Sequence, residues 1–425
     1  MDRFQLPQTP RDKGKRPPGG QKGHKGHTLQ LDPNPDGVIV HTVSICSQCG
    51  ESLENVEPFD KECRQIFDFL ALCFFVLEHC AEHKRCPRCG CVNKAAFPAD
   101  VAHPVQYGIN LKTFLVYLCV YQLLPYERAS EIVSDLFGHH VSPATVVAIV
   151  NECSQNLTGV EGDMRKLLQN AHTLHVDETG MRVGGTRQWL HVASTDLLTC
   201  YGHHRNRGAK ATEAMGILPE FQGTAVHDFW APYFGYACSH AICNAHLLRE
   251  LRGITENFGH HWSGTLGNLL IEIKTAADIA KQEGRSLTPE KIAAFEEQYL
   301  RILEAGKEEL EASGFHEMQG KHGRKKQSKA RNLLDRYYKY QKEILAFMKD
   351  SSIPFTNNQA ERNHRMMKLK QKISGTFRSE KGARNFCRVR GFISMIKKHG
   401  RQVFPELMRV FEGAPFIPTV IHRVP

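Results

Sequence analysis

The chain has 425 residues, of which 41% are apolar, so it is long enough for two or three domains with a sizeable core. It contains no run of about 18 uncharged apolar residues and no signal-peptide core, so we expect a cytoplasmic protein without membrane contact. The formal net charge of +10 favours a polyanionic partner. Fourteen cysteines in such a chain indicate metal ligands or reduced thiols rather than a disulfide framework.

Residues 1–40 are predicted to form a flexible basic arm. Residues 15–27 read KRPPGGQKGHKGH, a stretch with almost no side chains that could build a core. The arm is either a plain linker or a contact for backbone phosphates.

Residues 41–100 are predicted to form a small zinc-binding domain. Two C-x-x-C-G motifs supply the candidate ligands Cys46, Cys49, Cys86 and Cys89. Four thiolates make a closed, structural zinc site. A predicted hairpin over residues 65–76 could bring the motifs together. A redox dithiol is the alternative for a single motif.

Residues 101–170 form a predicted helical region. Apolar residues recur at helical spacing from Leu111 to Cys119, and Ser142 followed by Pro143 is a typical helix start. The helices are compatible with a helix-turn-helix that binds DNA, or with a bundle that braces the core. Because no basic residue lies between Ser142 and Val150, the bracing role is favoured.

Residues 171–400 are predicted to contain an α/β catalytic core. Asp177 lies in a predicted strand that forms a hairpin with residues 188–193. Asp228 ends a later short strand, just before an aromatic turn. An Asp in a half-buried strand is costly without a partner, and a metal ion is one such partner.

The third candidate acid, Glu361, lies on a predicted helix that begins near Asn357. Three cations follow Glu361 along one stripe of this helix: Arg365, Lys368 and Lys372. A neighbouring apolar stripe is predicted to dock on the core: Met366, Leu369 and Ile373. Three carboxylates, two from strands and one from a helix, can hold a pair of Mg²⁺ ions, which favour oxygen ligands.

The stretch after Glu361 is strongly basic, with twelve Lys or Arg against two Glu between residues 361 and 400. Further candidate phosphate contacts in this stretch are Ser374, Thr376, Arg378 and Arg384. Such contacts would hold DNA without reading its sequence.

Between Asp228 and Glu361 the sequence predicts an all-α insertion at about residues 255–350, with a basic loop at 321–329. The insertion either covers the core or clamps DNA. Cys243 and His246 form a C-x-x-H pair, which without a second pair nearby we interpret as a core cysteine and a polar contact. Residues 401–425 form a predicted C-terminal tail.

Five segments of the chain resemble one known family: HVDET, HDFWAPY, CNAHLLREL, PFTNNQAERNHRMMKLKQKISGTFRS and GARNFCRVRGFIS. They are similar to segments of the DDE transposases of the insertion-sequence-sixty-six family. The resemblance implies a ribonuclease-H-like core with Asp177, Asp228 and Glu361 as the catalytic triad. The predicted fold class is therefore an α/β ribonuclease-H-like core with an all-α insertion, preceded by the zinc-binding domain and the helical region.

The resemblance implies a bacterial transposase that acts on DNA near the nucleoid. It would bind the ends of its insertion sequence, cleave a strand and transfer the strand to target DNA, using two Mg²⁺ or Mn²⁺ ions. A homo-oligomer is expected during synapsis, and proteins encoded by the same element are possible accessories. The alternatives are a structure-specific nuclease on the same core and an inactive DNA-binding derivative of a transposase.

Overall fold

The computed structural model describes residues 31–35, 38–60, 62–66, 74–312 and 327–418. It divides into two compact units, residues 1–73 and 74–425. Most of the predicted basic arm, residues 67–73 of the predicted hairpin and residues 321–326 of the predicted basic loop lie outside the described residues. In the described part of the first unit, Ile45 and Ser52 form an isolated antiparallel β-bridge.

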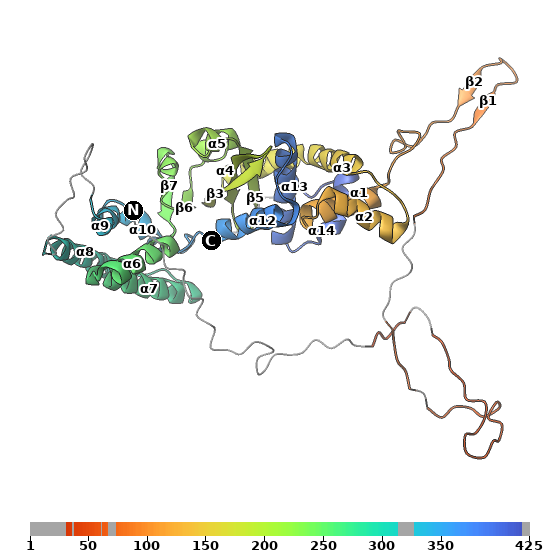
Figure 1. Cartoon of the computed structure of the whole chain (residues 1–425), viewed down its shortest axis with the longest axis horizontal. Coiled ribbons are helices and arrows are strands. Elements are labelled where there is room, and N and C mark those ends of the chain that lie inside the picture. The colour runs from red at the N-terminus through yellow and green to blue at the C-terminus, as the bar shows by residue number, and fades with distance from the viewer. Residues whose placement is uncertain (1–30, 36–37, 61, 67–73, 313–326, 419–425) are drawn as a thin grey trace. The chain divides into compact units, whose positions relative to one another are not determined.

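The second unit is built on a five-stranded mixed sheet in the order β5-β4-β3-β6-β7 (Figure 1). The strands are β3 (Thr173–Val183), β4 (Thr186–Ser194), β5 (Thr199–His204), β6 (Thr224–His227) and β7 (Ser239–Ile242). The first three strands are antiparallel neighbours, whereas β6 runs parallel to β3 and β7 runs parallel to β6. A separate two-stranded ribbon joins β1 (His83–Arg85) and β2 (Val92–Lys94). The predicted α/β class is confirmed.

The central strand β3 is buried on both faces, although the alternation of apolar and polar residues in its sequence predicts one buried face. Leu174 and Val176 are buried on one face, and His175 is buried on the other. The hairpin to β4 turns at Gly184 and Gly185, which both have positive φ (56° and 77°). Two such residues suit the tight turn that matches the twist of paired strands.

The predicted helical region packs against one side of the sheet unit. It consists of α1 (Ile109–Val116), a π-helical turn (Tyr117–Tyr121), α2 (Tyr126–Phe137), α3 (Pro143–Asn156) and α4 (Thr158–Gln169). Ser142 caps α3 by accepting a hydrogen bond from the Thr145 amide, as predicted. These helices share one hydrophobic cluster with β3–β5 and with the late helices α12 (Asn358–Ser374), α13 (Glu380–Lys398) and α14 (Val403–Phe411).

A second hydrophobic cluster joins the insertion helices to β6 and β7. The helices are α6 (Asn244–Phe258), α7 (His261–Gln282), α8 (Pro289–Ala312), α9 (Lys329–Lys339), α10 (Gln341–Ile344) and α11 (Ala346–Lys349). Figure 1 shows α6–α9 on one side of the sheet and α1–α3 with α14 on the other. Short elements complete the sheet connections: α5 (Ala209–Met215), η2 (Leu218–Glu220) and η3 (Ala231–Gly235). Among the described residues, no helix is long and apolar enough to cross a membrane.

The predicted docking stripe of α12 is wrong for two of its three residues. Leu369 is 50% exposed and Ile373 is 37% exposed, whereas Met366 is buried. The buried face is instead formed by Ala360, His364 and Met367. The helix is rotated in this way because its N-terminus is tied to β3, as described below.

Candidate active site

The two predicted catalytic aspartates come from neighbouring parallel strands. In the pairing of β3 with β6, His175 lies opposite Val226. Asp177 and Asp228 each follow two residues later, so this register carries Asp177, inside β3, toward Asp228, the first residue after β6. Burial raises the pKa of Asp228 above its ordinary value, and the negative charge of Asp177 raises it further, against the opposing effect of a hydrogen bond from the Trp230 amide.

Asn357, at the N-cap of α12, fixes this helix against the sheet. Its side-chain Oδ1 accepts a hydrogen bond from His175 Nδ1 (2.8 Å), and its Nδ2 donates to the carbonyl of Val176 (2.8 Å). Its backbone amide donates to Cys243 Sγ (3.1 Å). The first turn of α12, which carries Glu361, is thereby held between the ends of β3 and β7.

Two imidazoles lie close to the candidate acids, one near Asp177 and the other near Glu361. His364, one turn after Glu361, has its Nε2 3.2 Å from Asp177 Oδ2. His246, on the first turn of α6, has its Nε2 3.7 Å from Glu361 Oε1, and its charge acts to lower the pKa of Asp228. The first turn of α12 therefore lies in the same neighbourhood as both predicted aspartates.

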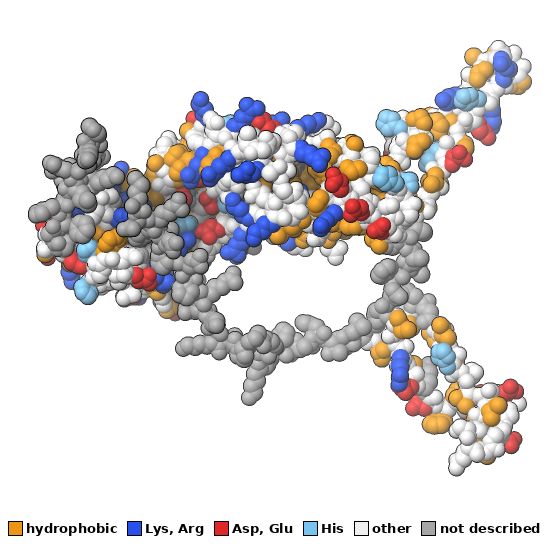
Figure 2. Space-filling model, viewed as in Figure 1, with side chains coloured by type: hydrophobic (Ala, Val, Ile, Leu, Met, Phe, Trp, Pro, Cys, Tyr) orange, Lys and Arg blue, Asp and Glu red, His pale blue; other side chains and the backbone are white. Residues whose placement is uncertain are grey.

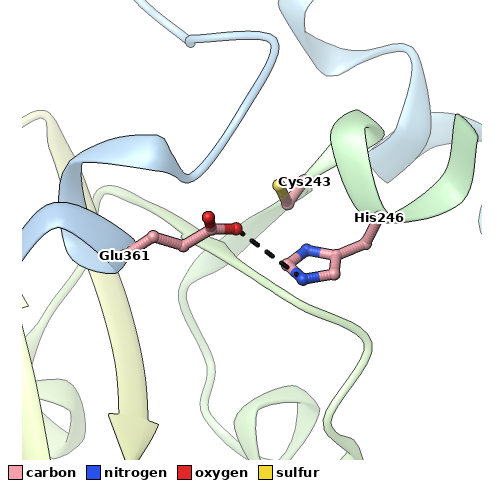
Figure 3. Close-up of side chains that lie close together, drawn as sticks. All are labelled: Cys243, His246 and Glu361. Atoms are coloured by element: carbon pink, nitrogen blue, oxygen red, sulfur yellow. Dashed lines mark ion pairs between the residues drawn. The ribbon is translucent and has the colours of Figure 1, made fainter. Parts of the chain in front are cut away.

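Glu361 itself contacts the insertion rather than solvent alone. Its carboxylate lies near His246 and, at 3.9 Å, near the Arg249 guanidinium. Figure 3 shows the Glu361 side chain reaching from α12 toward His246, with Cys243 beside them. Glu361 Oε1 is buried and has no hydrogen-bond partner among the described residues.

A second group beside the site was not predicted from the sequence. The side chain of Glu178 is 1% exposed and accepts hydrogen bonds from Arg207 and from the Tyr233 hydroxyl (2.7 Å). The Arg207 guanidinium lies over the rings of Trp189 and Trp230, 5.0 and 4.7 Å from their centroids. Burial raises the pKa of Glu178, and the hydrogen bonds from Tyr233 and Arg207 only partly offset this effect. The aromatic turn after Asp228 was the one sequence signal for this group.

The predicted DNA contacts mostly lie at the surface. Exposed side chains are those of Arg365, Lys368, Lys372, Thr376, Arg378 and Arg384. Ser374 is different, because its hydroxyl donates to the Leu123 carbonyl (2.7 Å) and accepts from Lys370 Nζ (2.6 Å). In Figure 2, Lys and Arg side chains gather over the region of the sheet and α12, around a smaller group of acidic side chains.

The two predicted zinc motifs have the same backbone form, each in its own unit. The amide of Gly50 donates to the Cys46 carbonyl (3.0 Å), and the amide of Gly90 donates to the Cys86 carbonyl (2.9 Å). Both glycines have positive φ, 77° and 74°. Hydrogen bonds from the amides of Cys49 and Cys89 lower the pKa of Cys46 and Cys86, which favours the thiolate form that binds zinc.

A family model of transposases, the IS66 family, matches residues 104–385. The chain belongs to the IS66 transposase family. The match covers more than half of the chain, and it includes the three candidate acids and the basic part of α12, whereas Cys46, Cys49, Cys86 and Cys89 lie before it. Membership indicates a DNA-processing enzyme that acts on a DNA substrate and uses divalent metal ions. The search of curated proteins gave no match.

Proposed function

We propose that this IS66-family chain cleaves the ends of its own insertion sequence and joins them to target DNA, with Asp177, Asp228 and Glu361 as the catalytic acids. The observation that supports the proposal is the parallel register of β3 and β6, which carries Asp177, inside β3, toward Asp228, just after β6. The tie of the α12 N-terminus to β3 through Asn357 supports the role of Glu361. The strand order, with three antiparallel strands followed by two parallel ones, supports a ribonuclease-H-like core.

The three acids fit hard divalent cations such as Mg²⁺. Asp228 is half-buried and feels the charge of a second carboxylate, and Glu361 Oε1 has no hydrogen-bond donor among the described residues, so this group of acids favours a cationic partner. When bound, two such ions activate the attacking oxygen and stabilise both oxygens of an in-line phosphodiester displacement.

The reaction would proceed in two displacements at phosphorus. In the first, water forms a new P–O bond, the bond between phosphorus and the 3′-oxygen breaks, and a 3′-hydroxyl is released. In the second, that hydroxyl attacks a phosphodiester of target DNA, and a strand oxygen of the target leaves. The chain's part is to orient the DNA, and the exposed cations of α12 would neutralise its phosphates.

The Cys46, Cys49, Cys86 and Cys89 thiolates would hold one structural Zn²⁺ in a small domain before the core. The lowered pKa values of Cys46 and Cys86 support this assignment. The domain boundaries, at about residues 40, 100, 170 and 400, and the formation of a homo-oligomer at synapsis, are part of the same proposal.

The test uses duplexes that carry the DNA flanking the gene, incubated with the purified chain in Mg²⁺. A transposase releases 3′-hydroxyl ends and then yields joined products on a second duplex. A nuclease would cut without joining, and an inactive derivative would bind without cutting. Either result would overturn the proposal.

A further inference from the structure

Glu361, one of the three candidate acids, also lies close to a cysteine and a histidine. One ligand atom each from Cys243, His246 and Glu361 lies within 4.8 Å of the others. Figure 3 shows the side chains of Glu361, from the first turn of α12, and His246, from the first turn of α6, facing each other, with Cys243 beside them. The C-x-x-H pair therefore gains a third ligand from a helix that is distant in the sequence.

The convergence is fixed by the backbone. Cys243 is the N-cap of α6, so His246 lies three residues later on the same side of the first turn. The Asn357 amide donates to Cys243 Sγ, and the Asn244 amide donates to the Phe355 carbonyl (3.0 Å). The hydrogen bonds between the starts of α6 and α12 hold the three side chains close together, and His246 forms an ion pair with Glu361.

Two polar atoms of the group have no hydrogen-bond partner in the part of the chain that the structure describes. His246 Nδ1 and Glu361 Oε1 are both buried and have no hydrogen-bond partner among the described residues. The distance of 3.7 Å between His246 Nε2 and Glu361 Oε1 is too long for a hydrogen bond. A buried polar atom without a partner destabilises the fold. A bound ion would satisfy such atoms, whereas a simple core cysteine beside a polar contact leaves them unexplained.

The ligand types select the class of ion. A thiolate and an imidazole favour borderline ions such as Zn²⁺ or Co²⁺, whereas Mg²⁺ favours oxygen ligands alone. Zinc ligands lie at 2.0–2.3 Å from the ion, so ligands to one ion lie about 3–4 Å apart, close to the spacing of this group. Three protein ligands leave one position open, as in catalytic rather than structural zinc sites.

We infer that Cys243, His246 and Glu361 form a binding site for a divalent ion of the Zn²⁺ class at the edge of the candidate active site. The inference rests on the proposed function only in that Glu361 is shared with the three acids. Occupancy would hold Glu361 against the start of α6. The half-exposed Arg249, 3.9 Å from Glu361, is the cation that this ion would have to compete with.

The experiment titrates the full chain, stripped of metal, with Co²⁺ alone and follows the thiolate-to-cobalt absorption and the number of ions bound. Cys243→Ser is compared with Cys238→Ser, which removes another buried thiol from the same sheet edge but outside the group. His246→Ala is the second variant, because its side chain is 40% exposed and its loss threatens the fold less. The thiols of residues 46–91 contribute equally in every variant, so differences report this site.

We expect Cys243→Ser to bind one Co²⁺ fewer than the parent and to lose part of the thiolate absorption. His246→Ala should bind that ion at least tenfold more weakly, and Cys238→Ser should match the parent. Equal numbers and affinities in the parent, Cys243→Ser and His246→Ala would overturn the inference. If Cys243→Ser does not fold, His246→Ala alone decides between these results. If the chain joins DNA in Mg²⁺ but the variants bind Co²⁺ like the parent, the proposed function stands and this site is wrong. If the variants lose Co²⁺ but the chain does not join DNA, the site stands and the proposed function is wrong.

Discussion

The Arg207 guanidinium donates two hydrogen bonds to Glu178 Oε1, from Nε at 2.8 Å and from Nη2 at 2.6 Å. Glu178 is the direct chain neighbour of Asp177, and it points to the opposite face of the sheet, as the alternation along a strand requires. Its partners Arg207 and Tyr233 come from the segments after β5 and after Asp228. Glu178 thus connects β3, which carries Asp177, to the segment after β5 through Arg207 and to the segment after Asp228 through Tyr233.

This relationship predicts that Glu178 is structural and that its loss is costly. Glu178→Ala removes the acceptor of the buried Tyr233 hydroxyl and leaves Arg207 without its carboxylate, so the free energy of unfolding should fall by about 1–3 kcal/mol. Glu178→Gln retains an acceptor for Tyr233 but places an amide N–H donor against Arg207, so it should recover only part of the loss. Urea denaturation measures both changes, with the exposed Glu127→Gln as a control expected to stay within about 0.5 kcal/mol. A Glu178→Ala variant as stable as the parent would show that the pair adds nothing.

Asp228→Asn is predicted to stabilise the metal-free protein in a pH-dependent way. The pKa of Asp228 is raised in the fold by burial, so the neutral form is favoured and stability is lost as the pH rises through the folded pKa. Below the unfolded pKa of about 4 the parent and the variant should melt alike. The variant should melt increasingly above the parent as the pH rises from about 4 through the folded pKa, and the difference should then level off.

Thermal melts in EDTA across this pH range provide the measurement. Asp135→Asn, an exposed carboxylate on α2, is the matched control and should show no comparable trend. A melting difference for Asp228→Asn that does not change with pH would contradict the burial of an ionised Asp228.

The zinc motifs give a third prediction. The double variant Cys46→Ser, Cys49→Ser should lose one equivalent of Zn²⁺ by elemental analysis, because two of four thiolate ligands are absent. Cys63→Ser, an exposed cysteine between the motifs, serves as the control and should retain the parent's zinc content. Full zinc in the double variant would place the ion elsewhere.

The basic face of α12 predicts a strong salt dependence of DNA binding. Replacing Arg365, Lys368 and Lys372 by Ala should reduce the slope of log affinity against log salt. Each lost phosphate contact lowers the slope by about 0.9, and up to three contacts are lost. The control removes the same charge from α8, at Lys291, Arg301 and Lys307, and should leave the slope unchanged. Equal slopes for both triple variants would show that DNA does not follow α12.

Much of the architecture could be predicted from the sequence, because its signals are local. The hairpin of β3 with β4, the short strand before Asp228 and the cap of α3 at Ser142 follow from periodicity and from turn and capping residues. The all-α insertion is also confirmed, and its last part consists of three short helices, α9–α11. The strand that contains Asp177 was predicted correctly. That β6 lies beside it could not be predicted, because no local pattern encodes a parallel pairing.

The errors have a common physical origin in long-range contacts. Leu369 and Ile373 match an apolar stripe, yet Asn357 ties the start of α12 to β3 and turns Ala360, His364 and Met367 inward. Cys243 and His246 lacked a third ligand in the sequence, because Glu361 is more than a hundred residues away. Periodicity cannot indicate which polar side chains meet after folding.

The central claim is tested most directly by strand cleavage and joining with three single variants: Asp177→Asn, Asp228→Asn and Glu361→Gln. Each keeps the shape of its side chain but removes a metal-binding charge, so the rate of both steps in Mg²⁺ should fall by more than the ~100-fold that loss of an outer-shell metal partner costs. DNA-end binding by the same variants should stay close to that of the parent. Asp196→Asn, an exposed acid in the turn between β4 and β5, should cleave and join DNA like the parent. Unchanged joining by any one of the three acid variants would contradict the assignment of the catalytic acids.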